Sequence, residues 1–414
     1  MSHNRKVFLS AISGNILEYY DFTVYAVFSI VIGKNFFPAA SEAVQVLSSL
    51  AVFAIGFVTR PIGGILFGYI GDIYGRRIAL ICSMVGMTMS TFSMGLIPDY
   101  SHIGIYAPVL LVMMRLIQGL CISGEGTGAA IFILEHYGNL RAGFVTGIVQ
   151  GSNIFGSLIA TFVGMMLEHS VYSDYAWRIA FLLGGIMGMM GFYVRLKVSE
   201  TPIFEELRKN KQKLKAPFFH VVKNAWRPMI LTICIAGTAG SIVQMIKSYV
   251  NVFFQSVMHL SSSTALGYLS YTLFITMLSM ASAGALSDFL GKTKMMILSA
   301  TSMLLFSLPV FLLMSSSNYI YQIMSLTMLG MIAGAIAGNA YIFVISLFTP
   351  EERFTGVSFS YNLGVAIFGG TTGFISTWLV KNLEMSFAPA FYLIFTSSSL
   401  LLVIYLMRNR IRKL

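Results

Sequence analysis

Charged side chains stand inside stretches of this sequence that are otherwise apolar and long enough to cross a membrane. Glu18 and Asp21 lie three residues apart in the first stretch, and Tyr25 joins their helix face four residues after Asp21. A charge at the centre of a bilayer costs about 2.5–3.5 kcal/mol on insertion scales, so such a group usually faces a cavity and has a function. Six residues share this setting: Glu18, Asp21, Arg60, Arg115, Glu125 and Lys247.

A carboxyl group beside an arginine in a dry site is suited to carrying a proton. Burial favours its neutral form and the cation favours its charged form, so a conformational change can switch it between the two. Glu125 and the Glu18–Asp21 pair are therefore the candidates for proton coupling. The structural alternative is that buried ion pairs hold the helices in register. The pairs expected in that case are Arg60 with Glu125 and Arg115 with Asp21.

The elements that must position these groups are membrane-spanning helices. The chain has 414 residues, of which 56% are hydrophobic and only 10% charged, and its mean hydropathy is +0.78. Such a composition cannot cover a water-facing surface, which excludes a soluble enzyme, a nucleic-acid binder and a secreted scaffold. Apolar stretches of roughly 20 residues, each able to cross a hydrocarbon core, recur along the whole chain. They predict twelve spans, at 8–33, 45–70, 78–97, 103–124, 142–167, 176–195, 228–256, 264–287, 295–314, 319–346, 356–380 and 388–407.

The positive charges are distributed unequally across the membrane. With both termini in the cytoplasm, the outside loops hold only Lys34, Arg178 and Lys381, and three more cations lie inside spans. All the other lysines and arginines, out of 27, then fall in cytoplasmic segments. This asymmetry fixes the expected orientation. The net charge of +11 therefore reflects topology and attraction to anionic lipid, and indicates no nucleic-acid partner.

A hydrophilic linker divides the chain at its middle. Within it, Thr201 is a candidate N-cap and Pro202 a first helical residue, so a short helix is expected to begin there. The lysines and arginines that follow suit a helix lying against the inner leaflet. We expect a six-helix half at 1–195, a basic cytoplasmic linker at 196–227 and a second six-helix half at 228–414.

One short motif occurs in both halves. Gly68, Asp72 and Arg76 end the second span, and Gly284 and Asp288 recur at the same internal spacing at the end of the eighth. This repeat predicts an all-α membrane protein with twelve transmembrane helices in two six-helix pseudo-repeats. The glycines allow close helix approach, and Asp72 can meet a helix N-terminus or an arginine. We interpret the motif as a cytoplasmic latch that breaks when the halves rock apart.

The second half offers mainly neutral hydrogen-bonding groups. Tyr361 and Asn362 lie in the eleventh span close to several glycines, and suit either substrate orientation or tight helix packing. The three cysteines have no disulfide or metal-ligand spacing, and the chain carries no nucleotide-binding loop. We therefore expect no metal and no cofactor, and a membrane protein that is not an enzyme.

These motifs resemble the major facilitator superfamily, and within it the metabolite:proton symporters. The superfamily signatures are the glycine–aspartate motif with its repeat, and Arg115 followed by Gln118. The subfamily signatures lie in the first two spans, Gly14-Asn-Ile-Leu-Glu-Tyr-Tyr-Asp-Phe22 and Gly56-Phe-x-x-Arg-Pro-Ile-Gly-Gly64. Further matches are Gly124-Glu125, Glu200-Thr-Pro202 and Tyr361-Asn-Leu-Gly364.

The resemblance implies a major facilitator fold that imports a small polar metabolite with protons, by alternating access between the two halves. Carried over by position, the charges of the first half would line a central cavity, and the repeated motif would form the inner gate. The candidate substrate-binding residues are Tyr19, Tyr25, Arg60, Arg115, Gln118, Lys247, Tyr361 and Asn362. The candidate gate residues are Gly68, Asp72, Arg76, Gly284 and Asp288.

Substrates in the family include citrate, 2-oxoglutarate, shikimate, proline and betaine. Arg60, Arg115 and Lys247 would leave a positive site once an acid is protonated, which favours a small organic anion (a carboxylate). A quaternary ammonium would want an aromatic cage, to which Tyr19, Tyr20 and Tyr25 can contribute, although Lys247 nearby would oppose it. A zwitterionic osmolyte or amino acid of the proline/betaine type is therefore the alternative, and drug or metabolite efflux by antiport a further one. We expect a monomer in a bacterial inner membrane, with lipid, a small substrate and protons as its partners.

Overall fold

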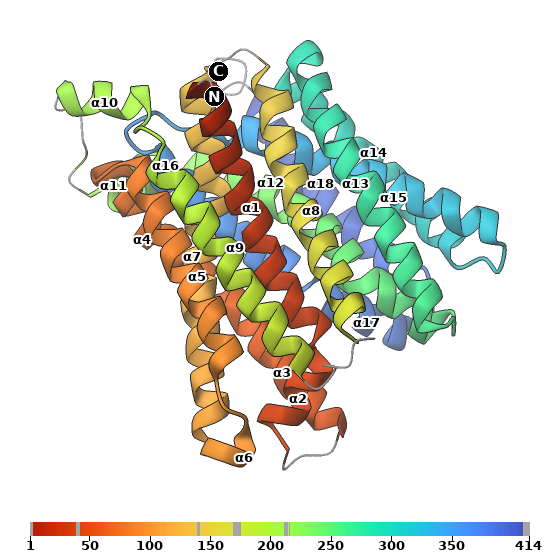
Figure 1. Cartoon of the computed structure of the whole chain (residues 1–414). Helices are drawn as coiled ribbons and strands as arrows, with labels where there is room; N and C mark the ends of the chain where they lie inside the picture. Colours follow the sequence, from red (N-terminus) through yellow and green to blue (C-terminus); the bar gives the residue numbers. More distant parts are fainter. Residues whose placement is uncertain are drawn as a thin grey trace. The chain divides into compact units, whose positions relative to one another are not determined.

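The computed structural model describes residues 3–38, 42–138, 141–168, 175–210, 214 and 216–408. Within these ranges the regular structure is entirely helical. A bilayer offers no water to backbone N–H and C=O groups, so an apolar segment must satisfy them internally, as a helix does. Among the described residues, ten helices are long and apolar enough to cross a membrane alone, and one bent pair adds an eleventh (Figure 1).

The helices follow the predicted spans along the chain. The first half contains α1 (His3–Val27), α2 (Ser29–Phe36), α3 (Glu42–Val58), α4 (Arg60–Ile73), α5 (Arg76–Leu96), α6 (Tyr100–Ile103), α7 (Tyr106–Tyr137), α8 (Ala142–Glu168) and α9 (Ala176–Leu196). The linker holds α10 (Pro202–Lys209) and α11 (Pro217–Asn224). The second half contains α12 (Trp226–Gln244), η2 (Met245–Val250), η3 (Phe253–Val257), α13 (Ser262–Leu290), α14 (Lys292–Met314), α15 (Tyr319–Ile345), α16 (Arg353–Gly364), η4 (Val365–Gly369), α17 (Thr372–Leu383) and α18 (Pro389–Leu406).

Several predicted spans are not single straight α-helices. The span predicted at 8–33 is the pair α1 and α2, which meet at 63°. The span predicted at 45–70 is α3 and α4, interrupted just before Pro61, whose ring removes a backbone donor. The seventh and eleventh spans contain the π-helical segments η2, η3 and η4, a rare form that often occurs at functional sites.

The chain divides into two compact units. Unit 1 comprises Met1–His136, Ser152–Phe218 and Pro350–Phe359, and unit 2 comprises Tyr137–Gly151, Phe219–Thr349 and Ser360–Leu414. Helices α8 and α16 are each divided between the two units. The first turns of α16 belong to unit 1, and the first part of α8 belongs to unit 2.

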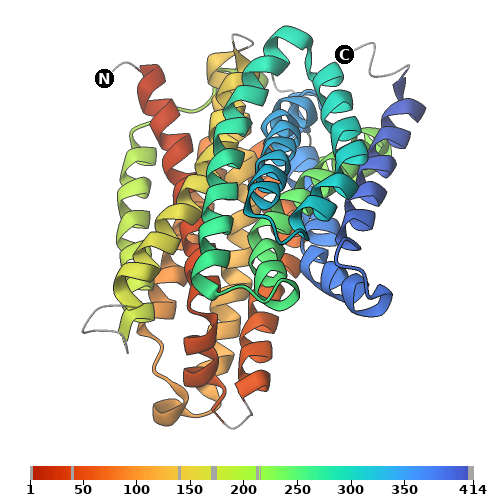
Figure 2. The same cartoon turned by 90° about the vertical axis from the view of Figure 1, so that its right-hand side faces the viewer.

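The same pairs of spans pack together in each unit. In unit 1, both α5 and α1 pack along α9, and in unit 2, both α14 and α12 pack along α18 (Figure 1 and Figure 2). Counted by membrane span, the third and the first span of each half pack along the sixth span of the same half. The two units therefore repeat one packing pattern, as the duplicated motif predicts.

An aromatic core holds α1, α2 and α9 together in unit 1. The ring of Trp177 meets those of Phe36 and Phe181 edge to face, with centroid distances of 5.6 Å and 6.3 Å. Tyr20 and Tyr25 of α1 belong to the same buried cluster. Such ring pairs combine large buried area with a defined geometry. The core thereby fixes which face of α1 points inward.

In each copy of the repeated motif, a glycine that follows the aspartate turns the chain between two helices. Gly75, between α4 and α5, has φ of 131°, and Gly291, between α13 and α14, has φ of 87°. Glycine adopts this backbone region without the steric penalty that a Cβ brings. The motif therefore encodes a tight turn in both units.

Candidate functional site

Asp21 lies in a buried polar cluster of unit 1. The residue is 2% exposed, and its Oδ2 accepts a hydrogen bond from the hydroxyl of Thr91 on α5 at 2.7 Å. On α9, a Cβ added to Gly184 would come within 2.6 Å of Oδ1. Three helices, α1, α5 and α9, therefore enclose this carboxyl group. Glu18, one turn earlier on α1, is also buried.

Arg115 of α7 is connected to Asp21 through two neutral side chains. Its Nη1 donates to Oε1 of Gln118, one turn along the same helix. Gln118 Nε2 donates in turn to Thr91 Oγ1 at 3.0 Å, and the Thr91 hydroxyl donates to Asp21. All four side chains are buried. We call this series the hydrogen-bond bridge.

Both arginines of the site lie on aromatic ring faces. The guanidinium carbon of Arg115 is 3.8 Å from the ring centroid of Tyr25 and 5.5 Å from that of Phe22. The guanidinium carbon of Arg60 is 4.4 Å from the centroid of Phe57 and 5.0 Å from that of Phe22. The ring faces therefore already hold cations. We call these three rings and two guanidinium groups the aromatic–arginine stack.

Arg60 owes its place in the stack to the interruption between α3 and α4. It is the first residue of α4, and Pro61 follows it, where the missing N–H has no helical partner to lose. The hydroxyl of Thr59 donates back to the carbonyl of Gly56 at 3.3 Å, which closes the end of α3. Arg60 is 5% exposed, so its charge is buried against the rings. Of the remaining candidates on α1, Tyr19 is half-buried.

Glu125 forms an ion pair with a residue that we expected in the cytoplasm. Arg195 of α9 donates to both carboxylate oxygens, at 2.5 Å to Oε2, and Ser83 of α5 donates to Oε2 at 3.2 Å. A side chain at Gly14 of α1 would overlap both partners of the pair. The predicted pairing of Glu125 with Arg60 is wrong, because α9 brings Arg195 alongside the middle of α7 while Arg60 joins the stack.

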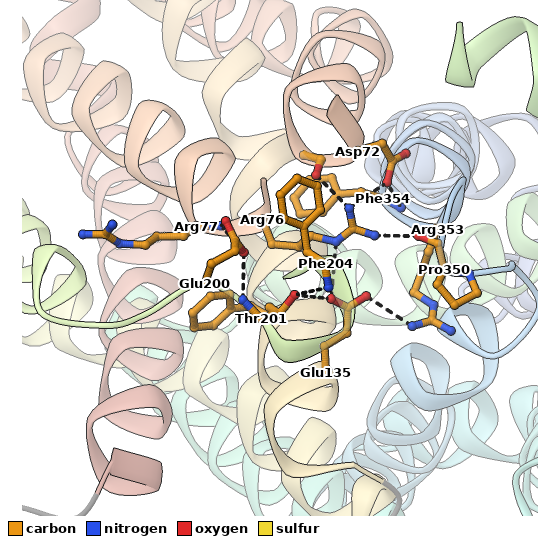
Figure 3. A network of polar contacts seen from close by, with 12 residues as sticks. Asp72, Arg76, Arg77, Glu135, Glu200, Thr201, Phe204, Pro350, Arg353 and Phe354 are labelled. Atoms are coloured by element: carbon orange, nitrogen blue, oxygen red, sulfur yellow. Dashed lines mark hydrogen bonds and ion pairs between the residues drawn. The ribbon is translucent and has the colours of Figure 1, made fainter. Parts of the chain in front are cut away.

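Asp72 caps a helix at the end of the first motif, as Figure 3 shows. Its oxygens accept hydrogen bonds from the backbone N–H groups of Phe354 at 3.2 Å and Thr355 at 2.9 Å, in the first turn of α16. Arg76 Nη1 lies 3.3 Å from Asp72 Oδ1. Gly68 packs on the same turn, where an added Cβ would lie 2.7 Å from Thr355 Cα. A carboxylate at this position satisfies unpaired N–H groups and complements the helix dipole.

Glu135, near the end of α7, connects the other members of this cluster (Figure 3). Its Oε2 lies 3.3 Å from Arg76 Nε and accepts a hydrogen bond from the Thr201 hydroxyl at 2.7 Å. Its Oε1 accepts from Arg353 Nη1 at 3.2 Å. Arg76 also donates to the carbonyl of Pro350 at 2.6 Å. We refer to these residues together with Asp72 as the Asp72 network.

The linker begins at the Asp72 network. Thr201 accepts a hydrogen bond from the backbone N–H of Phe204 at 3.2 Å, and Pro202 is the first residue of α10, so the predicted cap and helix start are confirmed. Glu200 accepts from the backbone N–H groups of Arg77 at 3.1 Å and Thr201 at 2.9 Å. Burial raises the pKa of Glu200 above its usual value, although these hydrogen bonds oppose the shift.

The second copy of the motif makes the equivalent contact in unit 2. Asp288 accepts hydrogen bonds from the backbone N–H groups of Gly143 at 2.7 Å and Phe144 at 2.9 Å, in the first turn of α8. Gly284 packs directly against Gly143, without room for a Cβ. Each motif therefore caps the N-terminus of a helix with its aspartate, which confirms that the two copies are structurally equivalent.

The candidate residues of the second half lie in unit 2. Lys247 is part of η2 and is half-buried. The Tyr361 hydroxyl accepts a hydrogen bond from Gln150 Nε2 at 3.1 Å, and its ring packs on that of Tyr341 at a centroid distance of 5.0 Å. Asn362 beside it is 5% exposed. The structure thus groups Tyr361 with Gln150 of α8, a residue that the sequence analysis did not single out.

Other members of the site were also missed by sequence reasoning. Nothing in the sequence indicates that Thr91 belongs to the site, because a hydroxyl inside an apolar helix is common and usually forms a hydrogen bond with the backbone of its own helix. Arg195 closes an apolar stretch, so it was counted with the cytoplasmic cations. Glu135 lies beyond the predicted end of the fourth span at 124, but α7 continues to Tyr137. A search over the described residues finds no group of three or more His, Cys, Asp or Glu that could hold a metal ion.

The repeated helical units, the buried charges and the paired helix caps define a multi-pass membrane transporter. The chain belongs to the Major Facilitator Superfamily, whose family model matches residues 11–373. The predicted family, the all-helical fold class and the assignment as a transporter and not an enzyme are therefore confirmed.

Known relatives resemble the chain over most of its length. It is 30% identical over 387 residues to the putative proline/betaine transporter of Staphylococcus aureus (strain COL), and the alignment covers 92% of this chain and 83% of that protein. It is 30% identical over 402 residues to the proline/betaine transporter of Escherichia coli (strain K12), covering 94% of this chain and 80% of that protein. Among solved structures, the proton:xylose symporter XylE aligns with a TM-score of 0.79 at 19% identity, over 99% of this chain and 96% of that one.

Proposed function

We propose that this chain is a proton-coupled symporter that imports a zwitterionic osmolyte or amino acid of the proline/betaine type. The observation that carries the proposal is the aromatic–arginine stack beside Asp21 in unit 1. Relatives that cover most of the chain are named for proline and betaine transport, which supports the same substrate class.

A zwitterion needs two complementary surfaces a short distance apart. The ring faces of Phe22, Phe57 and Tyr25 attract an ammonium group, and each already holds a guanidinium group. The guanidinium groups of Arg60 and Arg115 suit a carboxylate, which they can bind through two parallel hydrogen bonds. An ammonium group that takes a ring face releases the arginine that occupied it. The freed arginine can then bind the carboxylate of the same substrate.

A simple carboxylate would use only half of this arrangement. The expectation of an organic anion came from counting Arg60, Arg115 and Lys247 as open cations. Arg60 and Arg115 are instead engaged by ring faces, so a carboxylate must first draw each guanidinium group away from its ring. The stack therefore favours the zwitterion, which was the alternative in the sequence analysis.

We assign the transported proton to Asp21. It is buried, it accepts a hydrogen bond from the Thr91 hydroxyl, and it is connected to Arg115 by the hydrogen-bond bridge. Glu18, on the same face of α1, is the second candidate. Arg195 donates to both oxygens of Glu125, so Glu125 takes part only if that pair opens.

We further propose that the helix caps of Asp72 and Asp288 are the inner gate. Each aspartate holds the first turn of a helix by hydrogen bonds to two N–H groups, a contact that a small displacement would break. The distribution of lysine and arginine supports cytoplasmic termini in a bacterial inner membrane. One chain contains both six-helix halves, so we assign activity to the monomer.

Uptake of radiolabelled substrates by the purified chain in liposomes tests the proposal. With an inward proton gradient, we expect accumulation of glycine betaine or proline that an uncoupler abolishes, and no accumulation of citrate. Phe57→Ala should abolish uptake, whereas Phe374→Ala, at a 75% exposed ring of α17, should not. Accumulation of citrate alone would overturn the proposed substrate class.

A further inference from the structure

The hydrogen-bond bridge has one direction. Arg115 donates to Gln118, Gln118 donates to Thr91, and Thr91 donates to Asp21. A cation stands at the donor end and a carboxyl group at the acceptor end. Each neutral side chain between them accepts one bond and donates the next, and such chains polarise their members in the same sense.

The hydroxyl of Thr91 is the member of the bridge whose hydrogen bond changes when Asp21 is protonated. It has a single hydrogen, which it gives to Asp21 Oδ2, while its oxygen accepts from Gln118 Nε2. When the proton binds Oδ2 of Asp21, that oxygen becomes a donor toward Thr91. Thr91 then turns its own hydrogen elsewhere, for which a threonine in a helix can use a carbonyl three or four residues earlier.

We propose that Thr91 and Gln118 are positioning residues that link proton binding at Asp21 to the release of Arg115 for the substrate carboxylate. The inference rests on the proposed function, adds Thr91, which neither the motifs nor the relatives' names assign, and gives Gln118 a role other than the substrate binding expected of it. A proton from outside adds to an Asp21 oxygen, and the same O–H bond breaks when the proton leaves inside. No other covalent bond changes.

Protonation removes the anionic end of the bridge. The bond from Arg115 to Gln118 then loses the polarisation that Asp21 supplied, so Arg115 exchanges Gln118 for a substrate carboxylate at a lower cost. By linkage, a bound carboxylate that draws Arg115 away raises the affinity of Asp21 for its proton by the same factor. This reciprocity is the thermodynamic requirement of symport.

The groups around Asp21 leave the bridge as the main route of this coupling. On the packed helices, α5 contributes Thr91, α7 contributes Arg115 and α9 contributes the backbone at Gly184. The titratable neighbours on α1 itself are Glu18 and Tyr20, and the hydroxyl of Tyr20 donates to the carbonyl of Ala180 at 3.0 Å. Arg115 is therefore the cation that responds to the charge of Asp21.

The first experiment measures how the half-saturation constant for glycine betaine or proline depends on pH in liposomes. For the unaltered chain and Thr91→Ser, we expect the constant to rise about fivefold or more between pH 6 and pH 8. Thr91→Val keeps the shape and removes the hydroxyl, so the constant should become independent of pH. Thr88→Val is the matched control, because this buried threonine lies on the same helix and packs against Gly188 instead of Asp21. An unchanged pH dependence in Thr91→Val would overturn the proposal.

The second experiment needs no substrate. Thermal unfolding of purified Thr91→Val, Asp21→Asn and the double variant forms a double-mutant cycle. The bridge predicts that the two changes are not additive, because Asp21→Asn already removes the charge that Thr91 serves. Non-additive effects on unfolding, in a chain that transports neither zwitterion, would contradict the substrate assignment and still support the bridge. Additive effects would sink the bridge, whatever the substrate.

Discussion

Arg60 lies over the ring face of Phe57, with 4.4 Å between the guanidinium carbon and the ring centroid. The two residues are close in sequence, but they belong to different helices, α4 and α3, and both are buried. The ring therefore presents a face on which a cation is stable inside the membrane. A site with such faces suits a substrate that carries its own cation.

Removing this ring face should weaken uptake of zwitterions. In Phe57→Leu, a desolvated cation–π contact worth about 2 kcal/mol is lost, which corresponds to a roughly 30-fold higher half-saturation constant for glycine betaine. Phe57→Tyr keeps the face and should stay within a few-fold of the unaltered chain. The measurement is initial uptake against concentration in liposomes. Equal constants for the Leu and Tyr variants would contradict the role of the face.

Breaking the Glu125–Arg195 pair should destabilise the first unit strongly. Arg195→Leu leaves a buried carboxylate without its cation, at a cost of about 3–5 kcal/mol in the free energy of unfolding. Glu125→Gln combined with Arg195→Leu removes both charges and should recover most of that loss. Thermal unfolding in detergent makes the comparison. A double variant no more stable than Arg195→Leu alone would show that the ion pair is not what holds these helices.

Weakening the Asp72 cap should expose the start of α16. In Asp72→Asn, the side chain keeps one acceptor oxygen for two N–H groups and loses its charge. This change weakens the helix cap by about 1 kcal/mol. A cysteine at Thr355, with the three native cysteines replaced, should then react roughly fivefold faster with a membrane-impermeant maleimide in inside-out vesicles. Asp99→Asn, which alters contacts with Ser101 and His102 away from the Asp72 cap, is the control. A labelling rate unaffected by Asp72→Asn argues against the gate.

Glu200 should make stability depend on pH at the start of the linker. Burial raises its pKa in the folded chain, so the folded state binds the proton more tightly than the unfolded state does. Stability is therefore greatest below the unfolded pKa and falls as pH rises through the folded value. Melting temperatures measured between pH 4 and pH 7 should show this decline in the unaltered chain. Glu200→Gln should flatten it, and a decline of the same slope in that variant would place the titrating group elsewhere.

The sequence predicted the helices well, because membrane spans depend on composition over about 20 residues. Both copies of the motif were found because they repeat the same residues at the same spacing, and the Thr201 cap was found because an oxygen three residues before a backbone N–H is a local pattern. Where a span bends or breaks was less visible. The 63° angle between α1 and α2 has no proline at the junction to signal it.

The partners of the buried charges could not be predicted from the sequence. Glu125 pairs with Arg195, 70 residues away, and the choice depends on how α7 and α9 are placed side by side. Which ring faces hold Arg60 and Arg115 depends on side-chain rotamers, and these cannot be predicted from sequence spacing. As a result, the count of charges pointed to a carboxylate, whereas the contacts of those charges favour a zwitterion.

Proton-coupled symport of a zwitterion can be followed through the pH inside liposomes that hold the purified chain and a trapped dye. Glycine betaine, proline and citrate are added outside in turn. We expect internal acidification on addition of glycine betaine or proline, and none in Asp21→Asn. Acidification by citrate alone, or entry of labelled betaine without any change of internal pH, would contradict proton-coupled zwitterion symport.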